Sequence, residues 1–302
     1  MSRWSYPQDF DAGQAVSYAN FCQQAYFQYY ILNNIPPDFG YPQFQDILKL
    51  PPSGYQLLYN IYDDSDYFGY VANSTTDPSQ IVIALRGTEG WLEWSDDFLL
   101  SSQQSSPITG CPGLVHEGFA ILYEGLEYFK PPKGDSALLP IVLTGAKSVM
   151  VTGHSLGAAL GTLLVLDIAL NIAPKINCTV SSYNFASPMV GDPNFAGFFN
   201  QLVLKNAITA NFRVANGMDV VPNLPPNVFY PPGSSQECDY MQVDEYCPVD
   251  SGILSILSDA HSLSNYVIGL ENIANAESAR PIEHPASAMR GIPRGRTEGR
   301  RV

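Results

Sequence analysis

A serine between two glycines stands where a strand should meet a helix. The stretch SVMVTGHSLGAALGT, residues 148–162, contains the pattern Gly-x-Ser-x-Gly with Ser155 at its centre. The apolar residues before it are typical of a buried strand and residues 156–170 of a helix, which is the context that a nucleophile elbow requires. Gly153 and Gly157 permit a sharp turn, and a helix N-terminus favours a developing anion. We therefore predict that Ser155 is a nucleophile rather than a small residue in a structural turn.

A serine hydroxyl needs a base at neutral pH, and histidine suits that task best. The chain has four histidines. His154 lies beside the serine in the turn and should point to the opposite side, and His284 lies in a predicted tail. His116 precedes the nucleophile and is assigned a structural role. His261 follows the last predicted strand, where hydrolases with this turn place their base, so we predict that it is the general base.

An acid should orient the imidazole and stabilise its cation. In hydrolases of this kind the acid follows the serine and precedes the histidine. Asp219 comes after the apolar strand in NFRVANGMD and before a Pro-rich loop, so it should lie at the carboxyl edge of the sheet. Asp192 is predicted to cap a helix, and Asp259 is too close to the base in sequence. The acidic-loop aspartates, predicted to be solvated, are Asp239, Asp244 and Asp250. We predict that Asp219 is the acid.

Strands and helices alternate around these residues. Residues 11–33 have helical spacing, and 55–62 with 67–74 should form a hairpin around an acidic turn. Strands are predicted at 80–88, at the start of 114–130, at 148–155, 178–187 and 208–219, and helices in the remainder of 114–130 and at 156–172, 193–202 and 253–270. This order predicts an α/β fold with a mostly parallel central sheet flanked by helices. We expect one domain over 1–274 and a disordered tail over 275–302.

Composition excludes several classes of function. The 302 residues are 45% hydrophobic and 15% charged, as in an ordered globular protein. The net charge is −14, and since residues 280–302 carry six arginines and two glutamates (+4), residues 1–279 carry −18. Such a body would repel phosphate backbones, so nucleic-acid binding is not expected. It also disfavours docking on strongly anionic membranes, though not on neutral lipid.

No targeting or membrane-spanning segment is predicted. The start, MSRWSYPQDF, lacks the apolar region of a secretory signal, so the expected location is the cytoplasm, or outside the cell if a signal lies beyond this sequence. The longest apolar run, LGAALGTLLVLDIALNIA, is interrupted by Asp167 and is interpreted as a buried helix rather than a transmembrane one.

Neither a metal nor a cofactor is expected. The acidic cluster in DDSD lacks the ligand run of a calcium loop. The five cysteines form no CxxC motif, and free thiols are favoured over a Cys238–Cys247 disulfide, which would require export.

Six stretches together resemble the class 3 lipase family, the fungal-type triacylglycerol lipases and their bacterial and plant relatives. They are IALRGT, LVHEGF, VTGHSLGAALGTL, YNFASPMVGD, RVANGMDVVPNLPP and DAHSLSNY, in family order from about residue 81 to 266. The resemblance implies an α/β-hydrolase fold with Ser155, Asp219 and His261 as a catalytic triad. It also implies an oxyanion hole formed by Thr88 and by the backbone N–H of Leu156.

In that family the segment after the Arg-Gly-Thr turn is a mobile lid, which here is EGWLEWSDDFLL, at about 89–100. The predicted substrate-binding side chains of this lid are Trp91, Leu92, Trp94 and Phe98. The two tryptophans and the phenylalanine follow the i, i+3, i+7 spacing of one helix face. We expect an amphipathic flap that covers the site in water and opens at a lipid surface; the alternative is a face that always packs on the body. An ion pair between Arg86 and Asp97 would match a strand-to-lid pair of the family.

The combined features predict a serine ester hydrolase, in the first instance a lipase that hydrolyses acylglycerols at a lipid–water interface through an acyl-enzyme. One alternative is a soluble carboxylesterase of the feruloyl type, which shares the fold but carries a more polar flap. Another is a lipase-like binding protein without catalysis. The apolar lid favours lipid substrates, and the complete triad with its oxyanion hole favours catalysis.

Overall fold

A sheet of nine strands runs through the part of the chain that the structure describes. The computed structural model describes residues 6–35, 50–88, 102–131, 134–226, 228–229, 237–244, 246–251 and 260–278. The parallel half of the sheet contains β3 (Gln80–Leu85), β8 (Ser148–His154), β9 (Thr179–Phe185), β10 (Ala210–Asn216) and β13 (Tyr246–Val249), in that spatial order. Helices cover both faces of this half, which explains why its strands are mostly buried along their length.

The antiparallel half continues from β3. Its strands are β2 (Asp66–Ser74), β1 (Tyr55–Asp63), β6 (Leu126–Phe129) and β7 (Ser136–Ala137). Asp63 pairs with Asp66, so two residues close the predicted hairpin, and Asp64 takes the left-handed conformation with φ 52°. The hairpin around the acidic turn is therefore confirmed.

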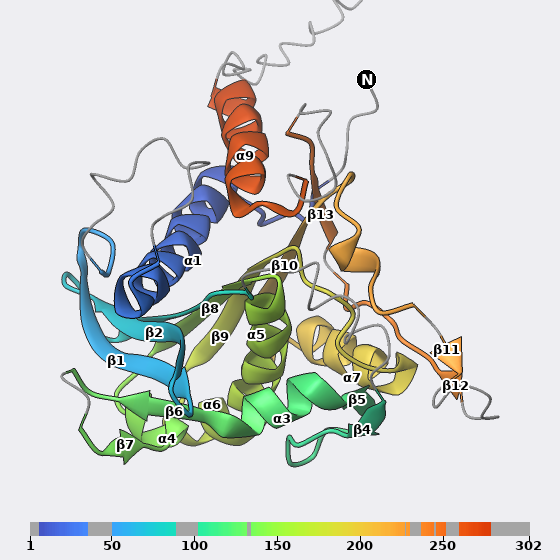
Figure 1. The fold of residues 1–302 in the computed structure, drawn as a ribbon, viewed down its shortest axis with the longest axis horizontal. Coiled ribbons are helices and arrows are strands. Elements are labelled where there is room, and N and C mark those ends of the chain that lie inside the picture. The colour runs from blue at the N-terminus through green and yellow to red at the C-terminus, as the bar shows by residue number, and fades with distance from the viewer. Residues whose placement is uncertain are drawn as a thin grey trace, which may run out of the picture.

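Helices lie on both faces of the sheet (Figure 1). On one face α1 (Ala12–Asn33) and α9 (Leu263–Ser278) pack against each other and on β9, β10 and β13. The opposite face buries α3 (Glu117–Gly125), α5 (Leu156–Asp167) and α7 (Pro193–Leu204) in the larger core. The predicted α/β architecture with a mostly parallel sheet and flanking helices is confirmed.

Smaller elements connect these layers. They are β4 (Gln103–Ser105), β5 (Leu114–His116), α4 (Leu139–Val142), the π-helix Ile168–Ile172, α6 (Ala173–Ile176), the 3₁₀-helix Val221–Asn223, β11 (Val228–Phe229) and β12 (Glu237–Cys238). Asp192 caps α7 as predicted, because its carboxylate accepts a hydrogen bond of 2.8 Å from the backbone N–H of Phe195.

Three predictions of secondary structure differ from the structure. The helix expected up to residue 130 ends at Gly125, because the following residues pair with β1 as strand β6. The segment expected to be only an acidic loop contains β13, although its aspartates, Asp239, Asp244 and Asp250, are exposed. Helix α9 begins at Leu263 and continues to Ser278, four residues beyond the expected domain boundary at 274.

The apolar run Leu156–Ile176 is long enough to cross a membrane, but 83% of its most apolar window is buried in the described structure. It forms the core helix that the sequence predicted. The five cysteines lie within the described residues and form no disulfide there. Burial raises the pKa of the Cys22 thiol to about 12.

Candidate active site

Ser155, His261 and Asp219 form a hydrogen-bonded chain at the carboxyl edge of the parallel strands. The Ser155 hydroxyl lies 2.8 Å from His261 Nε2, and His261 Nδ1 lies 2.9 Å from Asp219 Oδ2. The three residues are only 3%, 5% and 2% exposed. An ionised carboxylate can only accept, so Nδ1 carries the ring proton and Nε2 is free to accept the serine proton. The structure thus brings together the three residues that the sequence singled out.

The serine occupies a strained turn between β8 and α5. Ser155 has φ 57° and ψ −124°, a conformation that L-residues rarely adopt. Its backbone N–H donates to the carbonyl of Phe185 at the end of β9. A Cβ on Gly157 would overlap the carbonyl oxygen of Arg86, so the helix approaches β3 as closely as it does only because this residue is glycine. The turn therefore exposes the hydroxyl at a helix N-terminus, as the elbow pattern predicts.

Asp219 is held from two sides. Its Oδ1 accepts from the backbone N–H of Val221 at 3.0 Å, and its Oδ2 accepts from the hydroxyl of Tyr266 at 2.6 Å. Burial, and next the charge of Asp219, raise the pKa of the Tyr266 phenol well above its usual range, so the phenol stays protonated and donates. Tyr266 lies in the family stretch DAHSLSNY, five residues after the histidine, but no local pattern predicted a role for it.

The loop that carries His261 is fixed by its backbone. The side-chain amide of Asn216, the last residue of β10, donates to the carbonyl of Ala260 at 3.1 Å. The carbonyl of His261 itself accepts from His154 Nε2 at 2.9 Å. Two hydrogen bonds to adjacent carbonyl groups therefore set the position of the imidazole.

Thr88 and Leu156, the predicted oxyanion-hole residues, lie on either side of the serine. A Cβ on Gly87 would lie 2.8 Å from Cβ of Ser155, so the turn that carries Thr88 touches the nucleophile. Thr88 Oγ1 is buried and has no hydrogen-bond partner within the described residues. Leu156 is the first residue of α5, where a backbone N–H has no carbonyl one turn earlier to bind. Both residues can therefore offer donors to an anion beside Ser155.

Arg86 holds the same turn in place through its guanidinium group. Its buried guanidinium donates to the carbonyl of Gly87 at 2.7 Å and to Asp66 at 2.8 Å. It lies 3.7 Å from the ring centroid of Tyr29 on α1. Asp97, the partner expected from the family resemblance, lies outside the described residues, so that ion pair stays a prediction.

His154, predicted to point to the side opposite Ser155, contacts helix α1 and the backbone of His261 through its ring. Its ring centroid lies 4.9 Å from that of His261, and its Nδ1 lies 2.8 Å from the hydroxyl of Tyr26. Burial, and next the nearby His261, hold the pKa of His154 well below its usual range. Strand alternation places His154 opposite its neighbour but cannot show that His261 packs against it. His116 packs on Phe119, with 4.5 Å between ring centroids.

The lid predicted at 89–100 lies outside the described residues. The same holds for its substrate-binding side chains, Trp91, Leu92, Trp94 and Phe98. Their role stays a prediction.

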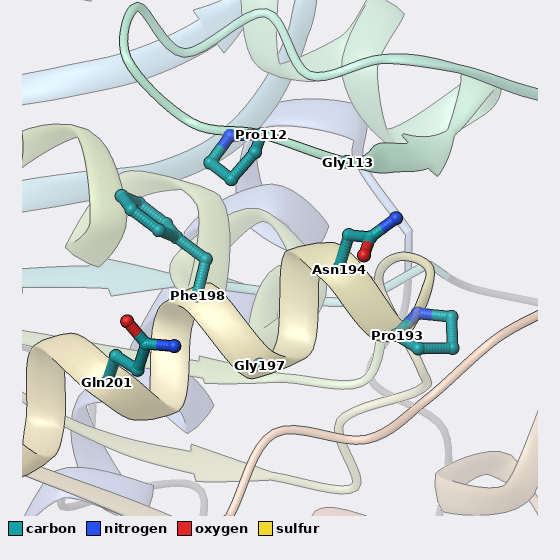
Figure 2. A pocket seen from close by; sticks show the side chains of 7 residues that line it. All are labelled: Pro112, Gly113, Pro193, Asn194, Gly197, Phe198 and Gln201. Carbon is teal, nitrogen blue, oxygen red and sulfur yellow. The ribbon is translucent and has the colours of Figure 1, made fainter.

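A surface pocket of about 330 Å³ lies beside α7, and Ser155, Asp219 and His261 are not among its lining residues (Figure 2). Its lining residues are Pro112, Gly113, Pro193, Asn194, Gly197, Phe198 and Gln201. In the described ranges no three His, Cys, Asp or Glu side chains are grouped so that they could hold a metal ion. The residues that line this pocket therefore offer no alternative to Ser155, Asp219 and His261 as a catalytic site.

The family model described as Lipase (class 3) matches residues 82–229. This segment contains the turn of Thr88, the serine elbow and Asp219. The chain belongs to the class 3 lipase family.

Among the relatives of the chain, Phospholipase A1-II 7 of Oryza sativa subsp. indica is 33% identical over 194 residues, which cover 54% of the chain and 47% of that protein. Phospholipase A1-II 6 of Oryza sativa subsp. japonica is 30% identical over 256 residues, which cover 72% of the chain and 58% of that protein. The match thus spans about half the length of these rice relatives.

A solved structure supports the fold of the chain. The Lip2 lipase of Yarrowia lipolytica superposes with a TM-score of 0.56 at 19% identity and covers 83% of the chain and 82% of its own. Similarity at this level of identity establishes the α/β-hydrolase fold.

Proposed function

We propose that this class 3 lipase is a serine ester hydrolase that cleaves acylglycerol lipids. The observation that carries the proposal is the aligned chain from Ser155 Oγ to His261 Nε2 (2.8 Å) and from His261 Nδ1 to Asp219 Oδ2 (2.9 Å). Acyl transfer requires a serine nucleophile, a histidine base that carries its proton on Nδ1, and an acid that orients this base.

The proposed reaction proceeds through an acyl-enzyme. Ser155 Oγ attacks the ester carbonyl while His261 Nε2 takes the hydroxyl proton, and the negative charge that develops on the carbonyl oxygen is stabilised by Thr88 and by the N–H of Leu156. His261 then protonates the departing alcohol. Water, deprotonated by the same imidazole, attacks the acyl-enzyme and releases the fatty acid and free Ser155. Asp219 stays ionised and stabilises the imidazolium in both steps.

The relatives and the net charge of the chain help to choose between classes of lipid substrate. The rice relatives are named phospholipases A1, which makes a phospholipid ester a second candidate beside a neutral acylglycerol. The net charge of −14 disfavours strongly anionic lipid surfaces. We therefore favour neutral acylglycerols, with zwitterionic phosphatidylcholine as the phospholipid to test. The apolar lid at 89–100 supports a lipid substrate over a small soluble ester.

An active-site label tests the nucleophile. A reactive alkyl phosphonate ester should form one adduct, which peptide mass spectrometry locates at Ser155, and a Ser155→Ala variant should form none. Absence of the adduct from the unmodified protein, or its persistence in the variant, would overturn the proposal.

A substrate panel tests the class of ester. The panel contains emulsified triacylglycerol, phosphatidylcholine vesicles, a soluble p-nitrophenyl butyrate and methyl ferulate. A rate that rises sharply above the solubility limit of the triacylglycerol supports a lipase. Hydrolysis of vesicles alone indicates a phospholipase, and simple saturation with the soluble esters alone indicates a carboxylesterase.

The same panel tests the lid. Trp91→Ser and Trp94→Ser should lower the rate on emulsion while leaving the rate on soluble butyrate close to that of the unmodified protein. Equal losses on both substrates would contradict a lid that serves lipid binding.

A further inference from the structure

Tyr26 on helix α1 lies between two parts of the site that come from distant segments of the chain. Its hydroxyl oxygen is 2.8 Å from the backbone nitrogen of Gly87 and 2.8 Å from Nδ1 of His154. The other ring nitrogen of His154 is 2.9 Å from the carbonyl oxygen of His261. These contacts join the residue before Thr88 to the backbone of the catalytic base through two side chains.

In this series of hydrogen bonds, the chemistry of each group decides which atom donates and which accepts. The carbonyl oxygen of His261 can only accept, so Nε2 of His154 carries a proton and donates it. Burial holds the pKa of His154 well below its usual range, so the ring is neutral and Nδ1 can only accept. The Tyr26 hydroxyl therefore donates to Nδ1, and its oxygen accepts from the N–H of Gly87. Every donor in the series therefore has an acceptor, and none of the hydrogen bonds can run in the opposite direction.

The side chains of these hydrogen bonds are closely packed at Gly87. A Cβ on Gly87 would overlap the hydroxyl oxygen of Tyr26 and would lie 2.8 Å from both the carbonyl oxygen of His154 and Cβ of Ser155. The ring centroids of Tyr26 and His154 are 5.8 Å apart, and those of His154 and His261 are 4.9 Å apart. Three segments thus meet at Gly87 as closely as glycine permits.

We propose that Tyr26 and His154 are positioning residues, and that their hydrogen-bonded bridge fixes the Gly87–Thr88 turn relative to His261. In acyl transfer the oxyanion donors and the base act on one carbonyl group at the same moment, so their spacing decides the rate. Neither side chain needs to touch the substrate. The inference deepens the proposed serine ester hydrolase activity and rests on it.

Two matched variants separate this role from a contribution to folding. Tyr26→Phe keeps the ring but removes the hydroxyl at the centre of the bridge. Tyr29→Phe makes the same change on the same helix; it keeps the ring over Arg86, and the Tyr29 hydroxyl takes no part in the bridge. Both variants are compared with the unmodified chain on p-nitrophenyl butyrate, which requires no lipid surface, and by melting temperature.

The expected result for Tyr26→Phe is a loss of kcat of about 10-fold or more, since a small displacement of reacting groups costs that much. KM should stay within about twofold, because the bridge does not bind the ester ground state. The rate at which the phosphonate labels Ser155 should fall by the same factor as kcat. Tyr29→Phe should match the unmodified protein in all three. The inference is overturned if Tyr26→Phe keeps its kcat, or if only KM changes.

A double-mutant cycle tests whether the bridge acts as one unit. His154→Asn keeps a polar group near the position of Nδ1 but does not reach His261, whereas His154→Gln extends an amide toward the position of Nε2. We expect His154→Gln to retain more kcat than His154→Asn, and Tyr26→Phe combined with His154→Asn to lose little more than the worse single variant. Losses that multiply would contradict a shared bridge.

The outcomes distinguish this inference from the proposed function. If the unmodified protein is not labelled at Ser155, both fail. If it is labelled and Tyr26→Phe is labelled at the same rate, only the bridge fails.

Discussion

The hydroxyl of Tyr266 donates a 2.6 Å hydrogen bond to Oδ2 of Asp219, the same oxygen that accepts from His261 Nδ1. The acid thus receives two donors on one oxygen, while its other oxygen accepts from the N–H of Val221. A carboxylate saturated in this way cannot rotate toward solvent, and it presents a fixed acceptor to the imidazole. Tyr266 is therefore part of what makes Asp219 an orienting group.

Removal of this hydroxyl should slow catalysis. For Tyr266→Phe we expect kcat/KM on a soluble ester to fall by about 10-fold, which corresponds to the roughly 1–2 kcal/mol worth of one hydrogen bond to a charged group. Tyr246→Phe serves as the control, because Tyr246 lies exposed on β13 and contacts Arg213 rather than the triad. Equal rates for Tyr266→Phe and the control would show that Val221 and His261 suffice to hold the acid.

The hydroxyl of Thr88 should contribute to the oxyanion hole. Because Oγ1 is buried without a partner among the described residues, we expect it to donate when the oxyanion forms. Thr88→Val retains the backbone N–H and the shape of the side chain, and kcat should fall by about 100-fold. Thr88→Ser retains the donor and should keep most of the activity. If Thr88→Val remains fully active, the backbone N–H alone serves the reaction.

The strained backbone of Ser155 should lower stability. Glycine adopts a positive φ without the steric cost that any other residue incurs, so Ser155→Gly should unfold with a free energy about 1 kcal/mol higher than that of Ser155→Ala. Neither variant has the nucleophile, so both should be inactive. Urea unfolding of the two variants measures the difference. Equal midpoints would mean that the surrounding turn relaxes when the hydroxyl is removed.

Burial of His154 should make the folded state sensitive to acid. Its pKa is held well below the ordinary value, so below about pH 6.5 the unfolded chain binds a proton that the folded chain does not. The free energy of unfolding should then decrease as the pH falls below 6.5, by up to roughly 1.4 kcal/mol per pH unit from this residue. Above that pH the contribution is constant.

Urea unfolding at pH 5, 6, 7 and 8 measures this dependence. The difference between the unmodified chain and His154→Asn isolates one residue, because the other histidines titrate in both. A steeper decrease in the unmodified chain is expected between pH 6 and 5. Parallel curves would contradict a neutral, buried His154.

The sequence predicted which three residues meet because Ser155 and Asp219 follow recognisable strands and His261 comes last in a fixed chain order. The elbow at Ser155 has a local signature, and Asp219 and His261 were found by their order after it. The contact between His154 and His261 was not predicted, because strand alternation describes one strand and not what packs against it. Tyr26 and Tyr266 were missed for a related reason, since each acts only after its helix docks on the sheet. Helical spacing cannot show which hydroxyl will meet which acceptor.

Strand pairing was predicted less well at the edges of the sheet. Residues 126–129 continue an apolar run that local periodicity assigns to a helix, and they become β6 because β1 offers an open edge. Tyr246–Val249 are too few to give a strand signal by themselves, and they pair with β10 only because that strand would otherwise be the edge. Both differences are consequences of tertiary contacts rather than of local preference.

The packing of α1 on α9 has a consequence for the order in which the enzyme is made. Tyr26 emerges early in synthesis, the serine about midway, and His261 with Tyr266 near the end of the described chain. A nascent chain therefore carries its nucleophile long before it has a base, an oriented acid or a fixed oxyanion turn. We expect that chains arrested on the ribosome before residue 260 bind no phosphonate at Ser155. Ser155 would then stay unreactive during synthesis until α9 docks on α1.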